Sequence, residues 1–502
     1  MIETQYFGLA PIPEVERMWA AFAARGLLVQ SSALHLQTVT NERSVTGIVV
    51  LVEGANYACE VRSLAVAGEK EGAATSLRSL ERRALLLALH WLLQRRTGHA
   101  LPWGVLFGVR PVKVLHAWWR LRRAQAGELA ASERDAALRM LTGDYAIRAD
   151  RAALLYDVAT SVRRVLPDWQ QLGREVSVYV GIPFCPTRCS YCTFPAYSMA
   201  EKAHYAADFL AALEREIGAV GEALTVSKCN VTTVYVGGGT PTSLCAEELE
   251  RLLTALVRHL PGGGSWREFS VEAGRADTLT PDRVRVMKEA GVSRVSVNPQ
   301  TFHESTLQLV GRGHSAALID KRFALVREAG FSNINMDLIM GLPGERLQNV
   351  RDSLARTLAL KPDSVTVHTL SYKRGAAVKG DASVPSFIEV EAMLDDAERE
   401  LREHGYLPYY LYRQKDILAD RENVGYALVS KEGLYNIAII EEWQSIVALG
   451  GGGASKWRDP VTGVITRSAN ARDPAAYVAH IDRIIADKRL RIHDLAKQCG
   501  LT

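Results

Sequence analysis

The sequence predicts an α/β fold whose centre is an incomplete, six-unit version of the TIM-like eight-unit barrel. Strand-like apolar runs alternate with segments of helical periodicity through the middle of the chain, and this alternation favours a parallel sheet with right-handed crossovers. A cysteine-rich loop directly follows the first of these runs. In such barrels the chemistry lies on loops after the C-terminal ends of the strands, so this loop stands where a site is expected.

Each of the six units consists of a strand-like run followed by a helical segment. Several of the helical segments end at glycine, as helix C-termini often do. The expected helices are 205–220, 246–260, 281–291, 316–330, 347–360 and 387–405. The expected strands are "VSVYVGIP" (176–183), "VTTVYVGGG" (231–239), "EFSVEAG" (268–274), "SRVSVNPQ" (293–300), "NINMDLIMG" (333–341) and "DSVTVHTLS" (363–371).

The chain divides into three predicted regions: an α+β N-terminal domain (1–170), the barrel (171–405) and a small α+β C-terminal cap (406–502). In the first region, runs at 33–40, 45–54 and 56–68 predict a small antiparallel sheet, followed by a helix at 80–97 and a helical region at 128–166. In the last region, "YLPYYLYRQK", "SIVALGGGGASKW" and "VTGVITRSAN" predict strands and turns, and a helix is expected near 474–488.

The composition is that of an ordinary globular protein, with 48% hydrophobic and 23% charged residues. A net charge of +4 is too small to favour a nucleic acid or a membrane surface as partner. The apolar run "ALLLALHWLL" (84–93) is much shorter than the roughly 20 residues that span a bilayer. The N-terminus shows no secretion signal, and seven cysteines without regular spacing argue against a disulfide framework. We therefore expect a cytoplasmic monomer with no membrane span and no nucleic-acid partner.

The stretch "YVGIPFCPTRCSYCTF" places Cys185, Cys189 and Cys192 on one short loop. Four-iron clusters usually take four thiolates, so three thiolates leave one iron with an open position for a reactant. A structural zinc site needs four ligands, and Cys229 and Cys245 have no partner pair at zinc-finger spacing. The loop therefore predicts an iron–sulfur cluster rather than a zinc site.

The C-x3-C-x2-C loop after a first barrel strand resembles the radical S-adenosylmethionine (SAM) superfamily. More narrowly, the chain is similar to the oxygen-independent coproporphyrinogen III oxidase family, and to its long-chain coproporphyrinogen dehydrogenase branch. Five further motifs follow in family order over about 175–455. They are "VYVGGGTPTSL" (234–244), "VEAGRADTLT" (271–280), "SRVSVNPQTF" (293–302), "LVGRGHS" (309–315) and "NMDLIMGLPGE" (335–345).

The resemblance implies a [4Fe-4S] cluster held by the three loop cysteines, with SAM bound to the open iron. One electron from the cluster would cleave the sulfonium bond and give methionine and a 5′-deoxyadenosyl radical. The implied contacts of the cofactors are Tyr179, Phe194, Gly238, Gly239, Thr240, Glu272, Gln300, Arg312 and Asp337.

Residue chemistry agrees with several of these roles, although each also has an ordinary structural explanation. The glycines suit a close approach of backbone, or a plain tight strand end. Arg312 offers a planar fork for a carboxylate, or a surface salt bridge. Asp337 lies in an otherwise apolar strand, where an unpaired carboxylate is costly to bury, so a ligand or partner is expected. His314 is expected to be structural rather than catalytic.

The activity that the resemblance implies is an oxidoreductase reaction on a tetrapyrrole substrate. Two propionates of coproporphyrinogen III would be oxidatively decarboxylated to vinyl groups, giving protoporphyrinogen IX in haem biosynthesis. The electron donor and the electron acceptor are unidentified. Because the substrate carries four carboxylates, four cations that follow expected strands are candidates to bind it, although solvated surface charge explains them equally well: Lys373, Arg374, Arg413 and Lys415.

Three departures from the family pattern leave alternatives open. Gly181 stands where many relatives have histidine, and Thr193 and Phe194 follow the third cysteine where other oxidases place an additional cysteine. Phe194 is shared with a haem chaperone branch, in which His368 or another histidine could bind haem iron. The forms "VEAGRAD" and "VSVNPQTF" agree instead with the long-chain branch. A different SAM-dependent reaction on a tetrapyrrole, such as methyl transfer with ring opening, is the third possibility.

Overall fold

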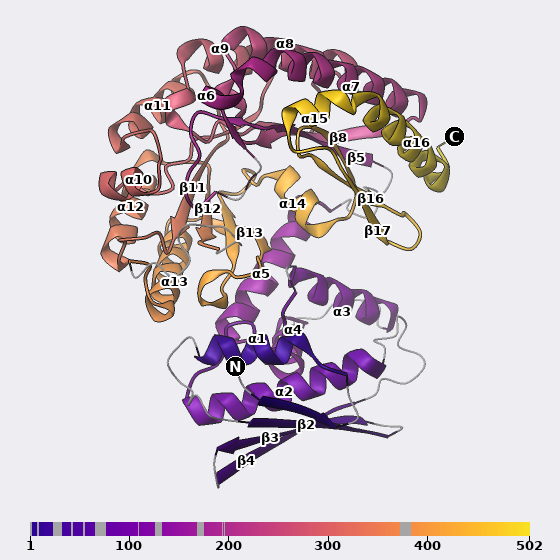
Figure 1. Ribbon diagram of the computed structural model, residues 1–502, viewed down its shortest axis with the longest axis vertical. Coiled ribbons are helices and arrows are strands. Elements are labelled where there is room, and N and C mark those ends of the chain that lie inside the picture. Colours follow the sequence, from indigo (N-terminus) through magenta and orange to yellow (C-terminus); the bar gives the residue numbers. More distant parts are fainter. Residues whose placement is uncertain are drawn as a thin grey trace. The chain divides into compact units, whose positions relative to one another are not determined.

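In the computed structural model, the chain forms two compact units (Figure 1). One consists of Met1–Thr160, Ser386–Glu391 and Leu411–Glu422, and the other of Ser161–Pro385, Ala392–Tyr410 and Asn423–Thr502. The domain boundaries expected at 170 and 405 stay predictions. The structure describes residues 3–7, 10–23, 33–41, 44–53, 56–65, 77–108, 110–125, 133–167, 175–192, 194, 196–371 and 383–501.

The larger unit contains the expected parallel sheet. The six strands β12-β11-β10-β9-β8-β5 are neighbours in reverse chain order, so each strand–helix unit adds one strand beside the previous one. Strand β5 is paired further to β15, and β12 to β14, so strands from the C-terminal region extend both edges of this incomplete barrel. The six strands are β5 (Glu175–Ile182), β8 (Asn230–Gly238), β9 (Glu268–Val271), β10 (Arg294–Ser296), β11 (Ile334–Met340) and β12 (Ser364–Thr369).

Helices form the outer layer of this unit, and the strands lie inside them (Figure 1). They agree with the expected segments to within a few residues at most ends: α7 (Ala206–Val226), α8 (Ala246–His259), α9 (Pro281–Glu289), α11 (Ala316–Glu328), α12 (Leu347–Leu360) and α13 (Phe387–Glu403). The short helices α6 (Met199–Lys202) and α10 (Glu304–Leu309) lie in loops after strands. No helix within the described ranges is long and apolar enough to cross a membrane.

Alternation along β5 separates the core from the barrel interior. Val176, Val178 and Val180 are fully buried in the large apolar cluster that also contains α7. Tyr179 points the other way and joins a small cluster inside the barrel with Tyr435. Because successive strand residues face opposite sides, an apolar strand of this pattern presents a functional side chain inward while anchoring itself outward.

The C-terminal strands are present, and they continue the barrel sheet at its two edges. They are β13 (Leu407–Tyr412), β14 (Asn423–Ala427), β15 (Ser445–Gly450), β16 (Ala454–Arg458) and β17 (Ile465–Ala469). A short helix, α14 (Leu434–Glu441), precedes β15. The helix expected near 474–488 is two helices, α15 (Pro474–Ala479) and α16 (Ile481–Cys499), because the chain leaves helical geometry at His480.

The smaller unit holds the expected N-terminal sheet and one strand that the sequence pattern missed. Strands β2 (Ala33–Thr40), β3 (Ser44–Glu53) and β4 (Asn56–Ala65) are antiparallel, as expected, but β1 (Glu3–Phe7) pairs parallel to β2. The described part of the region 128–166, which begins at 133, contains two helices. The helices of the N-terminal region are α1 (Pro13–Ala23), α2 (Leu77–Thr97), α3 (Val112–Gln125), α4 (Glu133–Asp144) and α5 (Ala149–Val165), whose residues after Thr160 belong to the larger unit.

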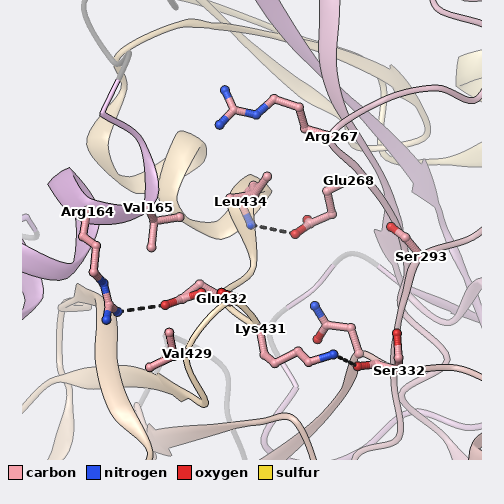
Figure 2. Close-up of a pocket in the computed structure, with 12 residues that line it drawn as sticks. Arg164, Val165, Arg267, Glu268, Ser293, Ser332, Val429, Lys431, Glu432 and Leu434 are labelled. Atoms are coloured by element: carbon pink, nitrogen blue, oxygen red, sulfur yellow. Dashed lines mark hydrogen bonds and ion pairs between the residues drawn. The ribbon is translucent and has the colours of Figure 1, made fainter.

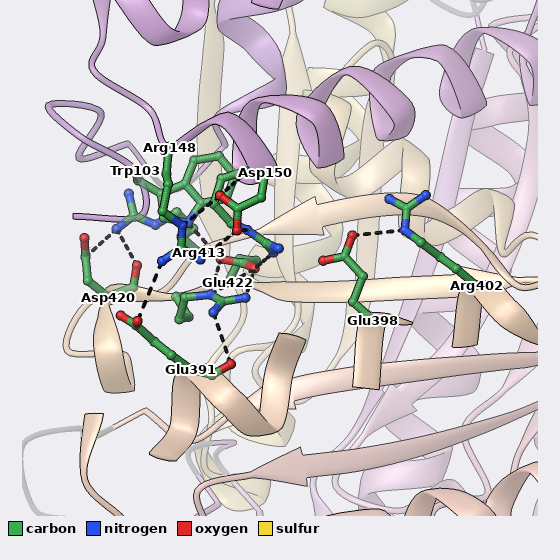
Figure 3. Close-up of polar contacts among 11 residues, drawn as sticks. Trp103, Arg148, Asp150, Glu391, Glu398, Arg402, Arg413, Asp420 and Glu422 are labelled. Atoms are coloured by element: carbon green, nitrogen blue, oxygen red, sulfur yellow. Dashed lines mark hydrogen bonds and ion pairs between the residues drawn. The ribbon is translucent and has the colours of Figure 1, made fainter. Parts of the chain in front are cut away.

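A buried ionic cluster joins the segment 411–422 to the N-terminal helices of the smaller unit (Figure 3). Glu422 accepts hydrogen bonds from Arg151 Nη1 at 2.7 Å and from Trp103 Nε1 at 2.8 Å. Burial opposes ionisation of Glu422, but Arg421 and Arg151 hold its pKa at about 2. Arg413, a candidate for binding substrate carboxylates, lies in this cluster, where its guanidinium donates to Asp420 and stacks 5.5 Å from the Trp103 ring. Arg413 therefore makes the contacts of a structural residue, and its role in binding substrate carboxylates stays a prediction.

We expect Lys488→Ala to destabilise the larger unit by about 3 kcal/mol, because it leaves the fully buried Glu216 carboxylate without its ion-pair partner. Urea unfolding followed by circular dichroism measures the loss. Arg489→Ala is the matched control on the same helix, since the Arg489–Glu222 pair is exposed and should contribute far less. Equal losses in the two variants would contradict a special role of the buried pair.

Candidate functional site

The cysteine loop is fixed to the glycine turn after β8 through the backbone. The Gly239 amide donates to the Ile182 carbonyl and the Thr240 amide to the Phe184 carbonyl, each at 2.7 Å. The Thr240 hydroxyl lies 3.4 Å from Cys185 Sγ. A Cβ on Gly239 would lie 2.4 Å from the Phe184 carbonyl oxygen and 3.0 Å from Cys185 Sγ. This approach therefore requires glycine, and it sets the position of the first cysteine.

Two arginines converge on the second cysteine of the loop. Arg275 Nη1 lies 3.7 Å and Arg312 Nη1 3.9 Å from Cys189 Sγ. Arg312 also donates to the Tyr191 hydroxyl at 3.1 Å and to the Asn298 carbonyl at 2.9 Å. Arg312 was predicted as a site residue, whereas Arg275 was not. The only sign of Arg275 in the sequence was that the motif "VEAGRAD" departs from the family pattern.

The three cysteines have free thiols, which suits ligation by iron. Burial raises the pKa of Cys185 to about 11 and also raises that of Cys192. A metal that binds them must therefore displace protons. Within the described ranges, no three His, Cys, Asp or Glu side chains are grouped to hold a single metal ion. An iron–sulfur cluster does not need three side chains around one ion, because each cysteine ligates a different iron of the cluster.

An acidic pair comes from β9 and β11: Glu272 directly follows β9, and Asp337 is the central residue of β11. The Asp337 carboxylate accepts hydrogen bonds from Asn298 Nδ2 and Asn335 Nδ2, both at 2.7 Å, and His368 Nε2 lies 3.5 Å away. Burial opposes ionisation of Asp337, but His368 and the amides hold its pKa below the ordinary value. Burial, and then the charge of Asp337, raise the pKa of Glu272 to about 7. The pair thus keeps one carboxylate charged and the other close to neutrality.

Gln300 combines an unusual backbone conformation with an unpaired side-chain oxygen. Its φ is +66°, a region that residues other than glycine rarely occupy. The backbone amide of Gln300 donates to the backbone carbonyl oxygen of Asp337 at 2.9 Å, and this bond fixes Gln300 beside the acidic pair. Its side-chain Oε1 is buried and has no hydrogen-bond partner among the residues that the structure describes. A buried acceptor without a partner is costly, so a donor on a bound ligand would satisfy it.

Three stacked tyrosines line the barrel interior beside the acidic pair. Tyr179 and Tyr235 are paired in register on β5 and β8, with ring centroids 6.2 Å apart. Tyr435, from α14, stacks 4.6 Å from Tyr235. The sequence predicted only Tyr179. Alternation along β8 could have identified Tyr235 as a second inward side chain, but no local pattern identifies Tyr435.

Contacts thus link the predicted residues of the cysteine loop, the glycine turn after β8, and strands β5, β9 and β11. Phe194 contacts Cys192 through its backbone, but its side chain is 53% exposed, and its role at the cluster stays a prediction. Thr193, beside it, lies outside the described residues, as do Lys373 and Arg374. His314 is buried, and burial lowers its pKa to about 4, so its imidazole is neutral at pH 7.

A pocket of about 540 Å³ lies elsewhere in the larger unit (Figure 2). It is lined at the N-terminal starts of β9, β10 and β11, the opposite ends of the strands from the cysteine loop. Arg164 pairs with Glu432 at 2.9 Å across it, and Glu268 accepts the Leu434 amide at 2.6 Å. In barrels this end serves stability, so we do not assign the site there.

Comparison with known proteins agrees with this geometry. Residues 179–356 match the Radical SAM superfamily. The oxygen-independent coproporphyrinogen-III oxidase-like protein HemZ of Bacillus subtilis is 43% identical over 400 residues, 79% of this chain and 78% of that protein. The heme chaperone HemW of the same organism is 32% identical over 238 residues, 46% of this chain and 62% of that protein. Coproporphyrinogen III oxidase (HemN) of Escherichia coli gives a TM-score of 0.50 at 24% identity, covering 65% of this chain and 72% of that structure.

The chain belongs to the radical SAM superfamily and, within it, to the family of oxygen-independent coproporphyrinogen-III oxidase-like proteins. The likeness to HemN agrees with an incomplete barrel, which confirms the expected fold class. The cofactors of this family are a [4Fe-4S] cluster and SAM. The free cysteines and the unpaired Gln300 Oε1 fit these two groups, and the individual ligand roles stay predictions.

We expect Gly239→Ala to lower the amount of iron bound after anaerobic reconstitution several-fold, because the new Cβ would displace Phe184 and Cys185. Iron and sulfide analysis measures the loss, and circular dichroism checks the fold. Gly218→Ala is the control: it lies in α7 with open space around it, and alanine there should stabilise the helix by up to about 1 kcal/mol. Normal iron content in Gly239→Ala would contradict the inferred constraint.

The raised pKa of Glu272 predicts a pH dependence of stability in the cofactor-free protein. The folded state binds a proton more tightly than the unfolded state, so this stabilisation is complete below pH 4.5 and is lost as pH rises through about 7. The difference corresponds to roughly 3 kcal/mol. Glu272→Gln, which stays neutral, should lose less stability between pH 5 and pH 8 than the wild type. Parallel urea midpoints in the two proteins would refute the assignment.

Proposed function

We propose that the protein is an oxygen-independent coproporphyrinogen III dehydrogenase, which converts two propionates of coproporphyrinogen III to vinyl groups. The observation that carries the proposal is the single constellation at the strand ends: three free cysteines beside two arginines, with Glu272, Gln300 and Asp337 next to them. The 43% identity to a coproporphyrinogen-III oxidase-like protein over most of the chain supports this class of substrate.

In this proposal Cys185, Cys189 and Cys192 hold the cluster. When bound, the cluster and SAM supply the one-electron chemistry that hydrogen abstraction from an unactivated carbon requires. Asp337 is charged and oriented by two amides, so it suits an amino or hydroxyl group of SAM. Gln300 Oε1 accepts a further donor from the ligand, and the tyrosine stack excludes water from the interior beneath.

A haem chaperone is the second candidate, and the 32% identity to a heme chaperone favours it. In that function a histidine would bind haem iron. His368 was one candidate, another histidine being the alternative, but its Nε2 lies 3.5 Å from the Asp337 carboxylate and contributes to the low pKa of that acid. Binding haem iron through this nitrogen would break the contact, so the geometry of His368 favours the dehydrogenase.

We expect the reconstituted protein, given SAM, a reductant and coproporphyrinogen III without oxygen, to release two molecules of carbon dioxide per substrate. Mass spectrometry follows the product, and 5′-deoxyadenosine is measured in parallel. Single alanine variants of Cys185, Cys189 and Cys192 should lose at least 100-fold of this activity, on the order of 3 kcal/mol. Cys245→Ser is the control, because Cys245 is exposed at the start of α8 and is not one of the three loop cysteines.

Other outcomes select the alternatives. Formation of 5′-deoxyadenosine with intact porphyrinogen, together with tight binding of haem that survives the cysteine substitutions, would replace the dehydrogenase with the chaperone. A methylated tetrapyrrole would indicate a different SAM-dependent reaction. Normal decarboxylation by a cysteine variant would overturn the ligand assignment itself.

A further inference from the structure

Arg275 is a buried cation that joins the cysteine loop to the loop after β9. Its side chain is 3% exposed. Nη1 donates to the Thr187 hydroxyl at 2.9 Å and faces Cys189 Sγ at 3.7 Å. Nε and Nη2 instead donate to the two oxygens of Asp277, at 3.0 and 2.7 Å. The guanidinium therefore bridges the sulfur and the carboxylate, with one edge bonded to each.

The surroundings hold the guanidinium in this orientation. Asp277 lies in the short 3-10 turn Ala276–Thr278, so Arg275 and its counter-ion come from one rigid loop. A Cβ on Gly313 would lie 2.8 Å from Arg275 Nη2 and 3.1 Å from Asp277 Oδ2. Because Gly313 has no side chain, the Arg275–Asp277 pair has room beside it. A bidentate pair of this kind is rigid, so the edge that faces Cys189 is fixed as well.

We infer that Arg275 is a positioning residue that raises the reduction potential of the cluster bound through Cys189. A reduced cluster carries one more negative charge than an oxidised one, so a fixed cation beside a ligating sulfur stabilises the reduced form. Hydrogen bonds to the ligand sulfurs act in the same direction, and they are a principal means by which proteins set such potentials. Asp277 opposes the effect because its negative charge lies on the far side of the guanidinium.

The inference rests on the proposed role of Cys189 as a cluster ligand, and it holds for a dehydrogenase and a chaperone alike. The two assignments are distinguishable. Iron content of the wild type and of Cys189→Ala tests the ligand. The potential of loaded variants tests Arg275.

The experiment is a redox titration of the reconstituted, full-length protein, followed by electron paramagnetic resonance of the reduced cluster. Four variants are compared with the wild type: Asp277→Asn, Arg275→Lys, Arg275→Gln combined with Asp277→Asn, and Arg283→Gln. The double variant replaces the ion pair with neutral amides and leaves no unpaired buried charge. Arg283 is the matched control, since it also binds this turn, through the Thr278 carbonyl at 3.0 Å.

Asp277→Asn should raise the potential, because it removes the opposing charge and keeps the guanidinium. The double variant should fall below Asp277→Asn by at least a tenfold change in the reduction equilibrium, which is 59 mV for a one-electron couple. The potential of Arg275→Lys should lie between those of Asp277→Asn and the double variant. The potential of Arg283→Gln should match that of the wild type.

Equal potentials in Asp277→Asn and the double variant would overturn the inference, and so would a lower potential in Asp277→Asn than in the wild type. If the double variant binds no cluster, Arg275→Lys decides instead: an ammonium cannot bond Asp277 and Cys189 along two separate edges, so its potential should fall below that of the wild type, and an equal potential would overturn the inference. An equal shift in Arg283→Gln would assign the effect to the turn rather than to the guanidinium.

Discussion

The site depends on the close approach of two backbones, at the cysteine loop and at the glycine turn after β8. The Phe184 carbonyl accepts the Thr240 amide, and Gly239 lies where any Cβ would meet Phe184 and Cys185. Parallel strands bring these two loops to one edge of the sheet, but only a residue without a side chain lets them touch. Once they touch, the first cysteine is fixed and the rest of its loop can be oriented by side chains.

Those side chains distribute charge unevenly around the loop. Arg275 and Arg312 face Cys189, whereas the charge of Asp337 on β11 acts on Glu272, which follows β9. Burial, and then the nearby charge of Asp337, raise the pKa of Glu272, so this acid is the more easily protonated of the two. Cations beside sulfur suit an anionic cluster, and carboxylates nearby suit the positive charge of a sulfonium cofactor.

The barrel and most of its site could be predicted from the sequence because the information is local. Strand alternation, helix periodicity and cysteine spacing each lie within one short segment, and the resemblance placed Arg312, Gln300 and Asp337. Tyr435 and Arg275 were missed for a physical reason. Their roles depend on contacts with distant segments, β8 and the cysteine loop respectively, and no period in the sequence records such contacts.

The replacement of the family histidine by Gly181 has a similar long-range explanation. Strand β15 pairs parallel to β5, and Gly450, at the glycine-rich end of β15, lies opposite Gly181. A Cβ on Gly181 would lie 2.6 Å from the Gly451 carbonyl oxygen, and one on Gly450 would lie 2.3 Å from the Gly181 carbonyl oxygen. The two strands can therefore be this close only because both positions lack side chains. In this chain a C-terminal strand therefore occupies the space that a side chain at 181 would need.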